Sequence, residues 1–283
     1  MKIDLHLHSH ISDGDLSPAA LVVAAVAAGL DVVALTDHDT AAGVEAALEA
    51  ARDRPLIVVP GLEISTCFPP HELHVLGYWV DPQAPSITAH QLAAVERRIK
   101  RMERMVQRLR EMGISVSLED VRRAAGPEAE VLGRPHLARA LLAGGYTRSF
   151  GEAFTRFISD GGPAFVSQDF PTPEEAIATI HAGGGVAVWA HPPLDVVEGL
   201  LPRFVEWGLD GVECFRPTVH ANDVDRLLRL ARENGLYPTG GSDWHGPRRH
   251  FELGEFNLRL DQVEDLLAVG GITAEARKAE ARS

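Results

Sequence analysis

The chain has 283 residues, of which 45% are hydrophobic, and this is enough for one large α/β barrel or two modest domains with a well-buried core. The formal net charge of -13 repels nucleic acid at long range, so it argues against a protein that coats duplex DNA or RNA. Two cysteines, Cys67 and Cys214, and no apolar stretch of membrane-spanning length indicate a reduced, cytoplasmic protein without a membrane span.

Apolar runs of strand length alternate with helix-like stretches along most of the chain. This alternation predicts βαβ units and a mainly parallel sheet, and about seven strands would form a closed or nearly closed barrel. The predicted strands are 3–7, 32–35, 56–59, 74–80, 186–190, 211–215 and 237–241. The first predicted helix is bounded by Ser17 and Pro18 before it and Gly29 after it. The predicted helices of the barrel are 19–28, 41–51, 173–182, 195–207 and 219–234.

The alternation fails between about residues 83 and 166. An Arg-rich helical pattern over 87–112 is followed there by helical pieces separated by Gly and Pro. We predict a mainly helical cap subdomain at 83–166, inserted into a barrel formed by 1–82 and 167–283. The alternative is a pair of ordinary long barrel helices, but the span is too long for one crossover connection.

The first predicted strand alternates strictly between apolar and polar residues. Strand periodicity therefore places His6 and His8 on one face, and Ile3, Leu5 and Leu7 on the other. In a parallel barrel, ligands and catalytic groups gather at the carboxyl ends of the strands, and a His-x-His pair there suits a cation such as zinc, manganese or iron. A single His-x-His pair also arises by chance, so it does not establish a metal site alone.

Each later strand run also finishes in a potential metal ligand. The further candidates are Asp13, His38, Glu63, His74, His191, Asp243 and His245. Residues unrelated to metal would scatter along the chain, so this repetition predicts one metal centre. Glu63 is the only candidate bridge between two ions. A carboxylated lysine cannot be the bridge, because the three lysines, Lys2, Lys100 and Lys278, all fall outside the strand ends. This weakens the case for an amide-hydrolysing or ring-hydrolysing enzyme with such a bridge.

Several sequence blocks together resemble the PHP (polymerase and histidinol phosphatase) family. They are Asp4-Leu5-His6-Leu7-His8-Ser9, Ser12-Asp13-Gly14, Thr36-Asp37-His38, Glu63, His74, Ala190-His191-Pro192 and Ser242-Asp243-Trp244-His245. The resemblance implies a distorted (β/α)7 barrel with a trinuclear centre, usually of manganese, iron or zinc, within the wider amidohydrolase grouping. By position it implies the ligand sets His6, His8, Glu63 and Asp243; Glu63, His74 and His191; and Asp13, His38 and His245. Within the family, the block 36–40 and the cap are similar to bacterial nucleoside 3',5'-bisphosphate phosphatases, also described as ribonuclease AM-like 5'-3' exoribonucleases.

The centre is expected to hold two or three divalent cations, with manganese first and iron or zinc as alternatives. Two cations about 3.5 to 4 Å apart lower the pKa of a shared water and hold the oxygens of a phosphate in line. We expect His38, Asp243 and His245 to take part in catalysis. Either histidine could assist the leaving oxygen, although a histidine bound to metal is a poor acid, so the general acid stays open.

An acidic protein that binds phosphate needs fixed positive charge beyond the metals. The insertion supplies it in Arg97, Arg98, Lys100, Arg101, Arg104 and Arg134. Arginine matches a phosphate with two parallel hydrogen bonds, and we expect Arg101, together with Arg134 and His136 in the turn 133–136, to contact the substrate. The alternative for the arginines of the long helix is a solvated charged face.

The leading hypothesis is hydrolysis of the 3'-phosphate of a nucleoside 3',5'-bisphosphate to phosphate and a 5'-nucleotide. The alternatives are a 5'-3' exoribonuclease on short 5'-phosphorylated RNA, a phosphatase of the histidinol-phosphate type, and an amidohydrolase that cleaves a C–N bond. The expected partner is a small phosphorylated substrate, either a nucleotide or a short RNA, with no membrane and no stable duplex DNA. The sequence does not specify the oligomeric state.

Overall fold

The computed structural model describes residues 1–167, 169–217, 219–247 and 251–273. Its strands form one sheet in the order β7-β6-β5-β4-β3-β2-β1-β8. The strands are β1 (Lys2–Leu7), β2 (Val32–Leu35), β3 (Ile57–Phe68), β4 (His71–Tyr78), β5 (Val186–Ala190), β6 (Gly211–Phe215), β7 (Tyr237–Gly240) and β8 (Leu258–Arg259). The sheet curls into a nearly closed barrel, because the amide of His8 at the end of β1 donates a hydrogen bond to the carbonyl of Trp244, just after β7, at 3.0 Å. The predicted α/β barrel is therefore confirmed.

The pairing of the strands corrects one prediction. β1, β2 and β3 are parallel neighbours, as are β5, β6 and β7, but β4 is antiparallel to both β3 and β5. The predicted mainly parallel sheet is interrupted at β4, because β3 continues to Phe68 and turns at Pro69-Pro70 directly into β4. A short connection of this kind can only join antiparallel neighbours. The hairpin places Glu63 and His74 on the same face of the sheet, since Glu63 pairs with Leu76 and Ser65 with His74.

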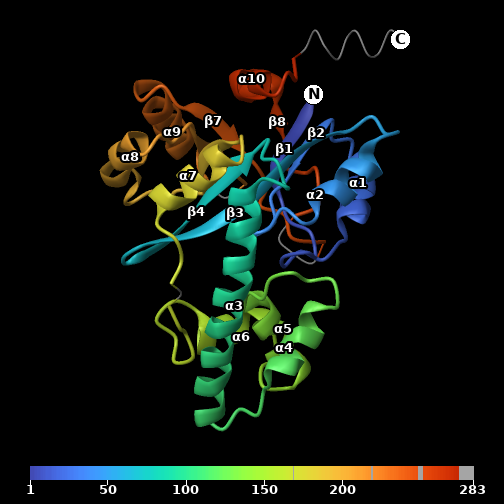
Figure 1. Cartoon of the computed structure of the whole chain (residues 1–283), viewed down its shortest axis with the longest axis vertical. Coiled ribbons are helices and arrows are strands. Elements are labelled where there is room, and N and C mark those ends of the chain that lie inside the picture. The colour runs from blue at the N-terminus through green and yellow to red at the C-terminus, as the bar shows by residue number, and fades with distance from the viewer. Residues whose placement is uncertain (168, 218, 248–250, 274–283) are drawn as a thin grey trace.

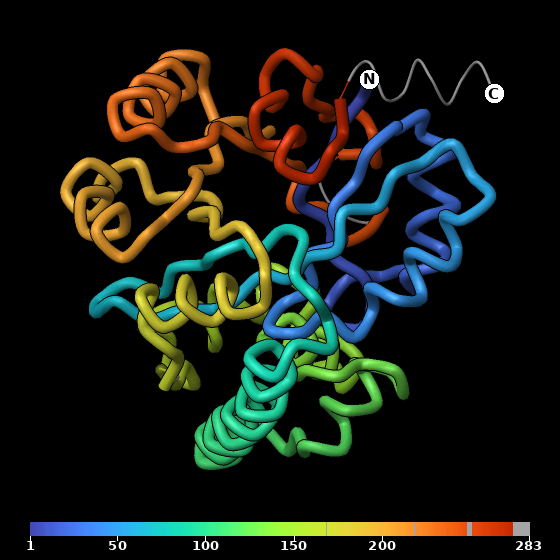
Figure 2. Tube along the Cα trace, turned by 45° about the horizontal axis from the view of Figure 1, so that its top comes forward, coloured from blue at the N-terminus to red at the C-terminus, as the bar shows by residue number. Residues whose placement is uncertain are grey.

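Helices surround the outside of the barrel, as Figures 1 and 2 show. They are α1 (Pro18–Ala27), α2 (Val44–Ala51), α7 (Pro173–Ala182), α8 (Val197–Glu206), α9 (Ala221–Glu233) and α10 (Leu260–Val269). The predicted start of α1 is confirmed, because Ser17 caps the helix by accepting a hydrogen bond from the amide of Ala20. Within the described residues, no helix combines the length and apolar composition that a bilayer crossing requires.

A second helical body extends from one end of the barrel (Figure 1). It consists of α3 (Pro85–Glu111), α4 (Leu118–Ala125), α5 (Arg134–Ala143), α6 (Phe150–Ala153) and a π-helical turn, η1 (Phe154–Ile158). These helices share their own buried cluster, in which Met105, Leu137 and Ile158 are 0% exposed. Near its start, α3 still packs on the barrel, because Ile87 belongs to the barrel core with Ile180 of α7. We call the helical body from α4 to η1, with the distal part of α3, the cap; its exact limits at 83 and 166 stay a prediction.

The barrel core between β5 and α8 is organised by two aromatic rings. Trp189 and Phe204 are both 0% exposed, and their rings stack with centroids 4.2 Å apart. Aromatic side chains bury more apolar surface than other residues, so this pair ties α8 to the sheet.

We predict that Phe204→Ala lowers the free energy of unfolding by about 3 to 5 kcal/mol, because it removes a buried ring and leaves a cavity. Urea unfolding followed by tryptophan fluorescence measures the change. Leu92→Ala is the matched control: Leu92 is 75% exposed, so its truncation should change stability by at most about 0.5 kcal/mol. Equal losses in the two variants would contradict this description of the core.

Candidate metal centre

The nine side chains predicted as metal ligands meet at one end of the barrel. β1 supplies His6, His8 follows β1 directly and β3 supplies Glu63, and all three residues are 0% exposed. The apolar residues Ile3, Leu5 and Leu7, which alternate with the two histidines, lie in the hydrophobic core as predicted. The other candidates lie in β4 or follow the ends of β1, β2, β5 and β7: Asp13, His38, His74, His191, Asp243 and His245.

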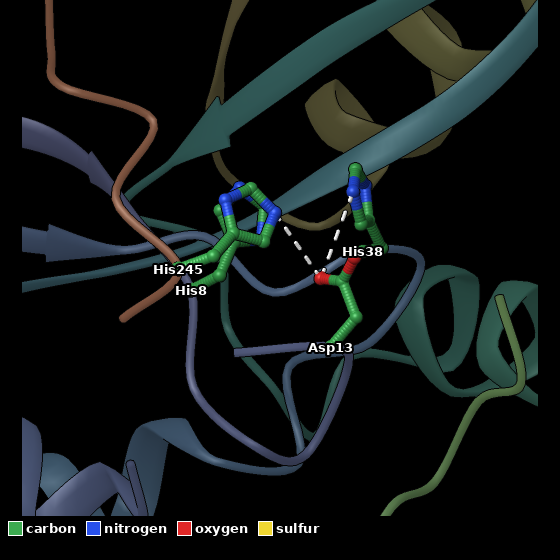
Figure 3. A group of neighbouring side chains, drawn as sticks. All are labelled: His8, Asp13, His38 and His245. Atoms are coloured by element: carbon green, nitrogen blue, oxygen red, sulfur yellow. Dashed lines mark ion pairs between the residues drawn. The ribbon is translucent and has the colours of Figure 1, made fainter. Parts of the chain in front are cut away.

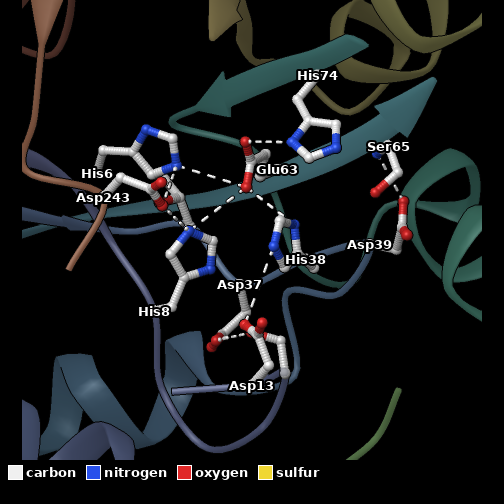
Figure 4. A network of polar contacts seen from close by, with 12 residues as sticks. His6, His8, Asp13, Asp37, His38, Asp39, Glu63, Ser65, His74 and Asp243 are labelled. Carbon is white, nitrogen blue, oxygen red and sulfur yellow. Dashed lines mark hydrogen bonds and ion pairs between the residues drawn. The ribbon is translucent and has the colours of Figure 1, made fainter. Parts of the chain in front are cut away.

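Glu63 lies at the middle of this group (Figure 4). Its Oε2 atom is 2.9 Å from Nδ1 of His38 and 3.4 Å from Nε2 of both His6 and His8. Its Oε1 atom is 2.9 Å from Nδ1 of His74 and 2.9 Å from Nε2 of His191. Each oxygen thus faces a different set of imidazoles, which is the arrangement that a carboxylate bridging two cations requires.

Ligand atoms within 4.8 Å of one another form four groups in the described residues. They are His8, Asp13, His38 and His245; His6, His8 and Asp243; His6, Glu63 and His191; and His38, Glu63 and His74. The first contains the whole third set that the resemblance implies, with His8 added. His74 and His191, which the resemblance implies for one ion, fall into separate groups that share Glu63.

The polar atoms of this region show that a cation would fit. Among the described residues, the buried atoms without a hydrogen bond of good geometry include Nε2 of His6, both ring nitrogens of His8, Nδ1 of His38 and Oε2 of Glu63. An unsatisfied buried polar atom costs about 1 to 3 kcal/mol, so such a concentration at one place is unusual unless something binds there. Imidazole and carboxylate together suit zinc, manganese or iron.

The side chains around the candidate ligands hold them in position. Glu213, which is 0% exposed, receives a hydrogen bond from Nδ1 of His6 at 3.0 Å and another from the backbone amide of His191 at 2.6 Å. A carboxylate on the second ring nitrogen fixes the orientation of a ligating histidine. The sequence left the role of Glu213 open; its position inside the short apolar strand β6 was the signal for a buried function.

The backbone is also shaped for this site. His191 and Asp243 have positive φ angles of 29° and 53°, which non-glycine residues rarely adopt outside functional sites. At Gly241 a Cβ atom would lie 2.3 Å from Cβ of His6, so only glycine lets the chain after β7 pass this close to β1.

The surroundings shift the pKa values of His8 and His6 in opposite directions. Burial, together with the neighbouring His245, lowers the pKa of His8 to about 3, so His8 is the neutral imidazole that can bind a cation. For His6, burial acts against the charged form, but the carboxylates of Glu63 and Glu213 outweigh it and raise the pKa. A cation that binds His6 would therefore replace a proton.

A cavity of about 240 Å³ joins this centre to the cap. Its lining includes Asp13, His38 and His74 from the barrel side, and Arg98, Arg101, Arg134 and His136 from the cap side. Arg101 is 8% exposed and lines this cavity; its Nη2 is 3.0 Å from Oε1 of Glu72. Arg98 lines it as well, which the sequence did not single out, and is already paired with Asp39 at 2.6 Å.

The structure corrects the predicted turn at 133–136. Gly133 is the N-cap of α5, and Arg134 is the first residue of this helix. Proline is tolerated at Pro135 because the first turn of a helix does not need its missing amide hydrogen. Arg134 contacts Asp160 and lies 3.4 Å from Glu72. Of the other predicted cations, Arg104 is exposed and Lys100 pairs with Glu96, which matches the alternative of a solvated face.

His136 lies in the wall of the same cavity and is 1% exposed. Its Nδ1 atom accepts a hydrogen bond from the amide of Gly133 at 3.0 Å. Burial lowers its pKa to about 4, so the ring is neutral and its one proton sits on Nε2. His136 can therefore donate a hydrogen bond through Nε2.

We predict that Glu63→Gln removes at least one bound ion per chain, because an amide cannot bridge two cations as a carboxylate does. Metal analysis of protein purified without chelator measures this loss. Glu213→Gln is the matched control, since it makes the same change in a carboxylate that is equally buried and also contacts His6. Its effect should be limited to a roughly 10- to 100-fold weaker affinity. Full metal content in Glu63→Gln would contradict the bridging role.

Comparison with known proteins identifies the family. Residues 4–100 match the family model described as PHP domain. A 5'-3' exoribonuclease from Haemophilus influenzae is 36% identical over 95% of this chain and 97% of its own length. A 3',5'-nucleoside bisphosphate phosphatase from Chromobacterium violaceum is 32% identical over 94% of this chain and 92% of its own length.

A solved structure gives the same result. The crystal structure of a protein from Bifidobacterium adolescentis, described as a metal-dependent phosphoesterase, superposes with a TM-score of 0.85. It is 32% identical to this chain, and the match covers 97% of this chain and 98% of that one. The barrel, the group of histidines and carboxylates at its end, and these similarities along nearly the whole sequence show that the chain belongs to the PHP family of metal-dependent phosphoesterases.

Proposed function

We propose that this protein removes the 3'-phosphate of nucleoside 3',5'-bisphosphates and releases a 5'-nucleotide and inorganic phosphate. The observation that carries this proposal is the cavity at the boundary of barrel and cap. One wall consists of the candidate metal ligands Asp13, His38 and His74, and the other of Arg101, Arg134 and their neighbours. A substrate with two phosphates can place one at each wall.

The metal centre holds two or three divalent cations in this proposal. Its ligands are those predicted from the sequence: His6, His8, Asp13, His38, Glu63, His74, His191, Asp243 and His245. Manganese is the metal we expect first, with iron or zinc as alternatives, because histidine and carboxylate admit all three and availability decides among them. Bound cations would supply a water of lowered pKa and neutralise charge on the phosphate.

Residues of the chain then position the reactants. Asp243 has the most open side chain among those paired in the centre, at 44% exposed, and its pKa is lowered because nearby histidines outweigh the effect of burial. It is therefore ionised and can accept a hydrogen bond from the attacking water. His38 lines the cavity, and Nε2 of His245 lies 3.2 Å from Oδ1 of Asp13, which lines it as well, so we assign these two histidines to catalysis.

The cap binds the other phosphate. Burial lowers the pKa of Arg101 to about 10, and Arg101 is still charged at neutral pH. Arg101 and Arg134 share the carboxylate of Glu72, so they are held as a pair that can receive a 5'-phosphate with charge-assisted hydrogen bonds. His136 adds a neutral donor beside them.

A 5'-3' exoribonuclease is the second candidate, favoured by the name of the Haemophilus influenzae relative. The same site serves both reactions, because a 5'-phosphate held by the cap leaves either a 3'-phosphate monoester or a phosphodiester at the metals. Activity on histidinol phosphate or on a C–N bond has less support, since neither substrate uses a second phosphate site. The free cysteines Cys67 and Cys214 fit a location in the reducing cytoplasm.

Turnover of a panel of substrates in the presence of Mn²⁺, with the products separated by chromatography, tests the proposal. The panel contains adenosine 3',5'-bisphosphate, a short 5'-phosphorylated RNA, histidinol phosphate and a cyclic amide. We expect the highest kcat/KM with the bisphosphate and no turnover after removal of the metal by a chelator. Faster release of mononucleotides from RNA would favour the second candidate, and turnover of the amide alone would overturn both.

Arg134→Met should lower kcat/KM for adenosine 3',5'-bisphosphate by roughly 10- to 100-fold, because it removes a charged hydrogen-bond donor worth about 1.5 to 3 kcal/mol. Adenosine 3'-monophosphate lacks the 5'-phosphate, so its kcat/KM should be unaffected. Arg123→Met is the control variant, since Arg123 is 70% exposed on α4 and pairs only with Asp120 among the described contacts. A loss of equal size on both substrates would show that Arg134 does not bind the 5'-phosphate.

A further inference from the structure

Arg139 of α5 reaches from the cap to the barrel loop that carries Asp13. Its Nη2 atom donates a hydrogen bond to the backbone carbonyl of Asp13 at 2.9 Å and to Oδ1 of Asp15 at 3.1 Å. The Arg139 and Asp15 side chains are 25% and 14% exposed, so this ion pair is largely shielded from water. A partly buried guanidinium that donates to two acceptors fixes the relative position of the two acceptors better than an exposed ion pair does.

The contact continues to the segment that carries His245. The backbone amide of Asp15 donates a hydrogen bond to the carbonyl of His245 at 2.6 Å. A Cβ atom at Gly246 would lie 2.2 Å from Oδ2 of Asp15, so the two segments touch and only glycine fits there. Arg139 therefore contacts the loop of Asp13 directly and the segment of His245 through Asp15.

Those two segments supply half of one ligand group. His8, Asp13, His38 and His245 place ligand atoms within 4.8 Å of one another (Figure 3). Asp13 and His245 follow strand ends, whereas Glu63, which is central to two other groups, lies within β3. The geometry of the first group thus depends on how two loops are held, and that of the Glu63 groups depends mainly on the sheet.

The loop with Asp13 is held from both sides. On the barrel side, the carboxylate of Asp37 accepts hydrogen bonds from the hydroxyls of Ser9 and Ser12 at 2.6 and 2.7 Å. On the cap side, the amide of Glu130 donates to the carbonyl of Ile11 at 2.8 Å. His10 also pairs with Glu128 of the cap. The position of the loop is consequently coupled to that of the cap.

We infer that Arg139 is a positioning residue that makes the His8, Asp13, His38 and His245 site bind its cation only when the cap is docked on the barrel. The inference rests on the metal centre of the proposed function. The same cap carries Arg101 and Arg134. When the cap is docked, it therefore places these two arginines at the cavity and also completes this metal site. The Glu63 sites do not depend on Arg139.

Titration of Mn²⁺ into the chelator-treated full-length protein, followed by electron paramagnetic resonance, tests this inference without an activity assay. Arg139→Met should weaken the binding of one ion by about 10- to 100-fold and leave the others unchanged. Asp13→Asn should weaken the same ion, because it alters the ligand itself. Arg123→Met, a cap arginine away from the loop, should match the wild type.

Unchanged binding of every ion in Arg139→Met would overturn the inference. So would an equal loss at all sites accompanied by a lower melting temperature of the metal-free protein, since that pattern indicates a structural role. If Arg139→Met does not fold, Arg139→Lys gives the same test, because it keeps the charge but not the two-acceptor geometry, and it should show a smaller loss at the same ion. A wild-type protein that binds all its ions but hydrolyses no phosphate ester would refute the proposed function while leaving this inference standing.

Discussion

The structure depends on one buried carboxylate surrounded by histidines. Glu63 is 0% exposed and lies within 3.4 Å of five imidazoles, which come from β1, from β4 and from the segments after β2 and β5. A buried charge is costly unless it is paired. Without a cation only a protonated imidazole can pair it, and the neighbouring carboxylates raise the pKa of His6 toward that charged form. Bound cations would take the place of that proton, because they compensate the carboxylate and satisfy the ring nitrogens at once. The barrel order and the close passage at Gly241 then follow as ways to bring distant segments to the same carboxylate.

The sequence predicted the barrel and the meeting of the ligands because both depend on local pattern. Alternation in β1 placed His6 and His8 on one face, and strand ends repeatedly carried a ligand. The sequence did not predict that β3 and β4 form a hairpin. The segment after Val59 contains polar residues, and these are buried only because they lie in the folded centre. Arg134 was placed in a turn, since the Gly and Pro around it resemble a loop as much as a helix start. The contacts of Glu213, Arg98 and Arg139 are tertiary, and no local pattern specifies them.

The barrel and the cap contribute different kinds of side chain to the site. In the proposed function, the barrel provides anionic and imidazole ligands in a fixed frame, and the cap provides arginines that would bind phosphate despite a net charge of -13. Glu72 at the β3–β4 hairpin joins the two parts, because it pairs with both Arg101 and Arg134. The loop of Asp13 is a second junction. In the proposed function, substrate recognition and the metal centre therefore meet at the same boundary, which would let one site act on monoesters and on short nucleic acids.

We propose that cations occupy the space around Glu63. Crystals grown with Mn²⁺ and measured at the manganese absorption edge test it directly, because anomalous scattering locates each metal without reference to activity. We expect anomalous peaks on both sides of the Glu63 carboxylate, each within coordination distance of histidine nitrogens. An enzyme that is active in the crystal but shows no peak beside Glu63 would contradict it.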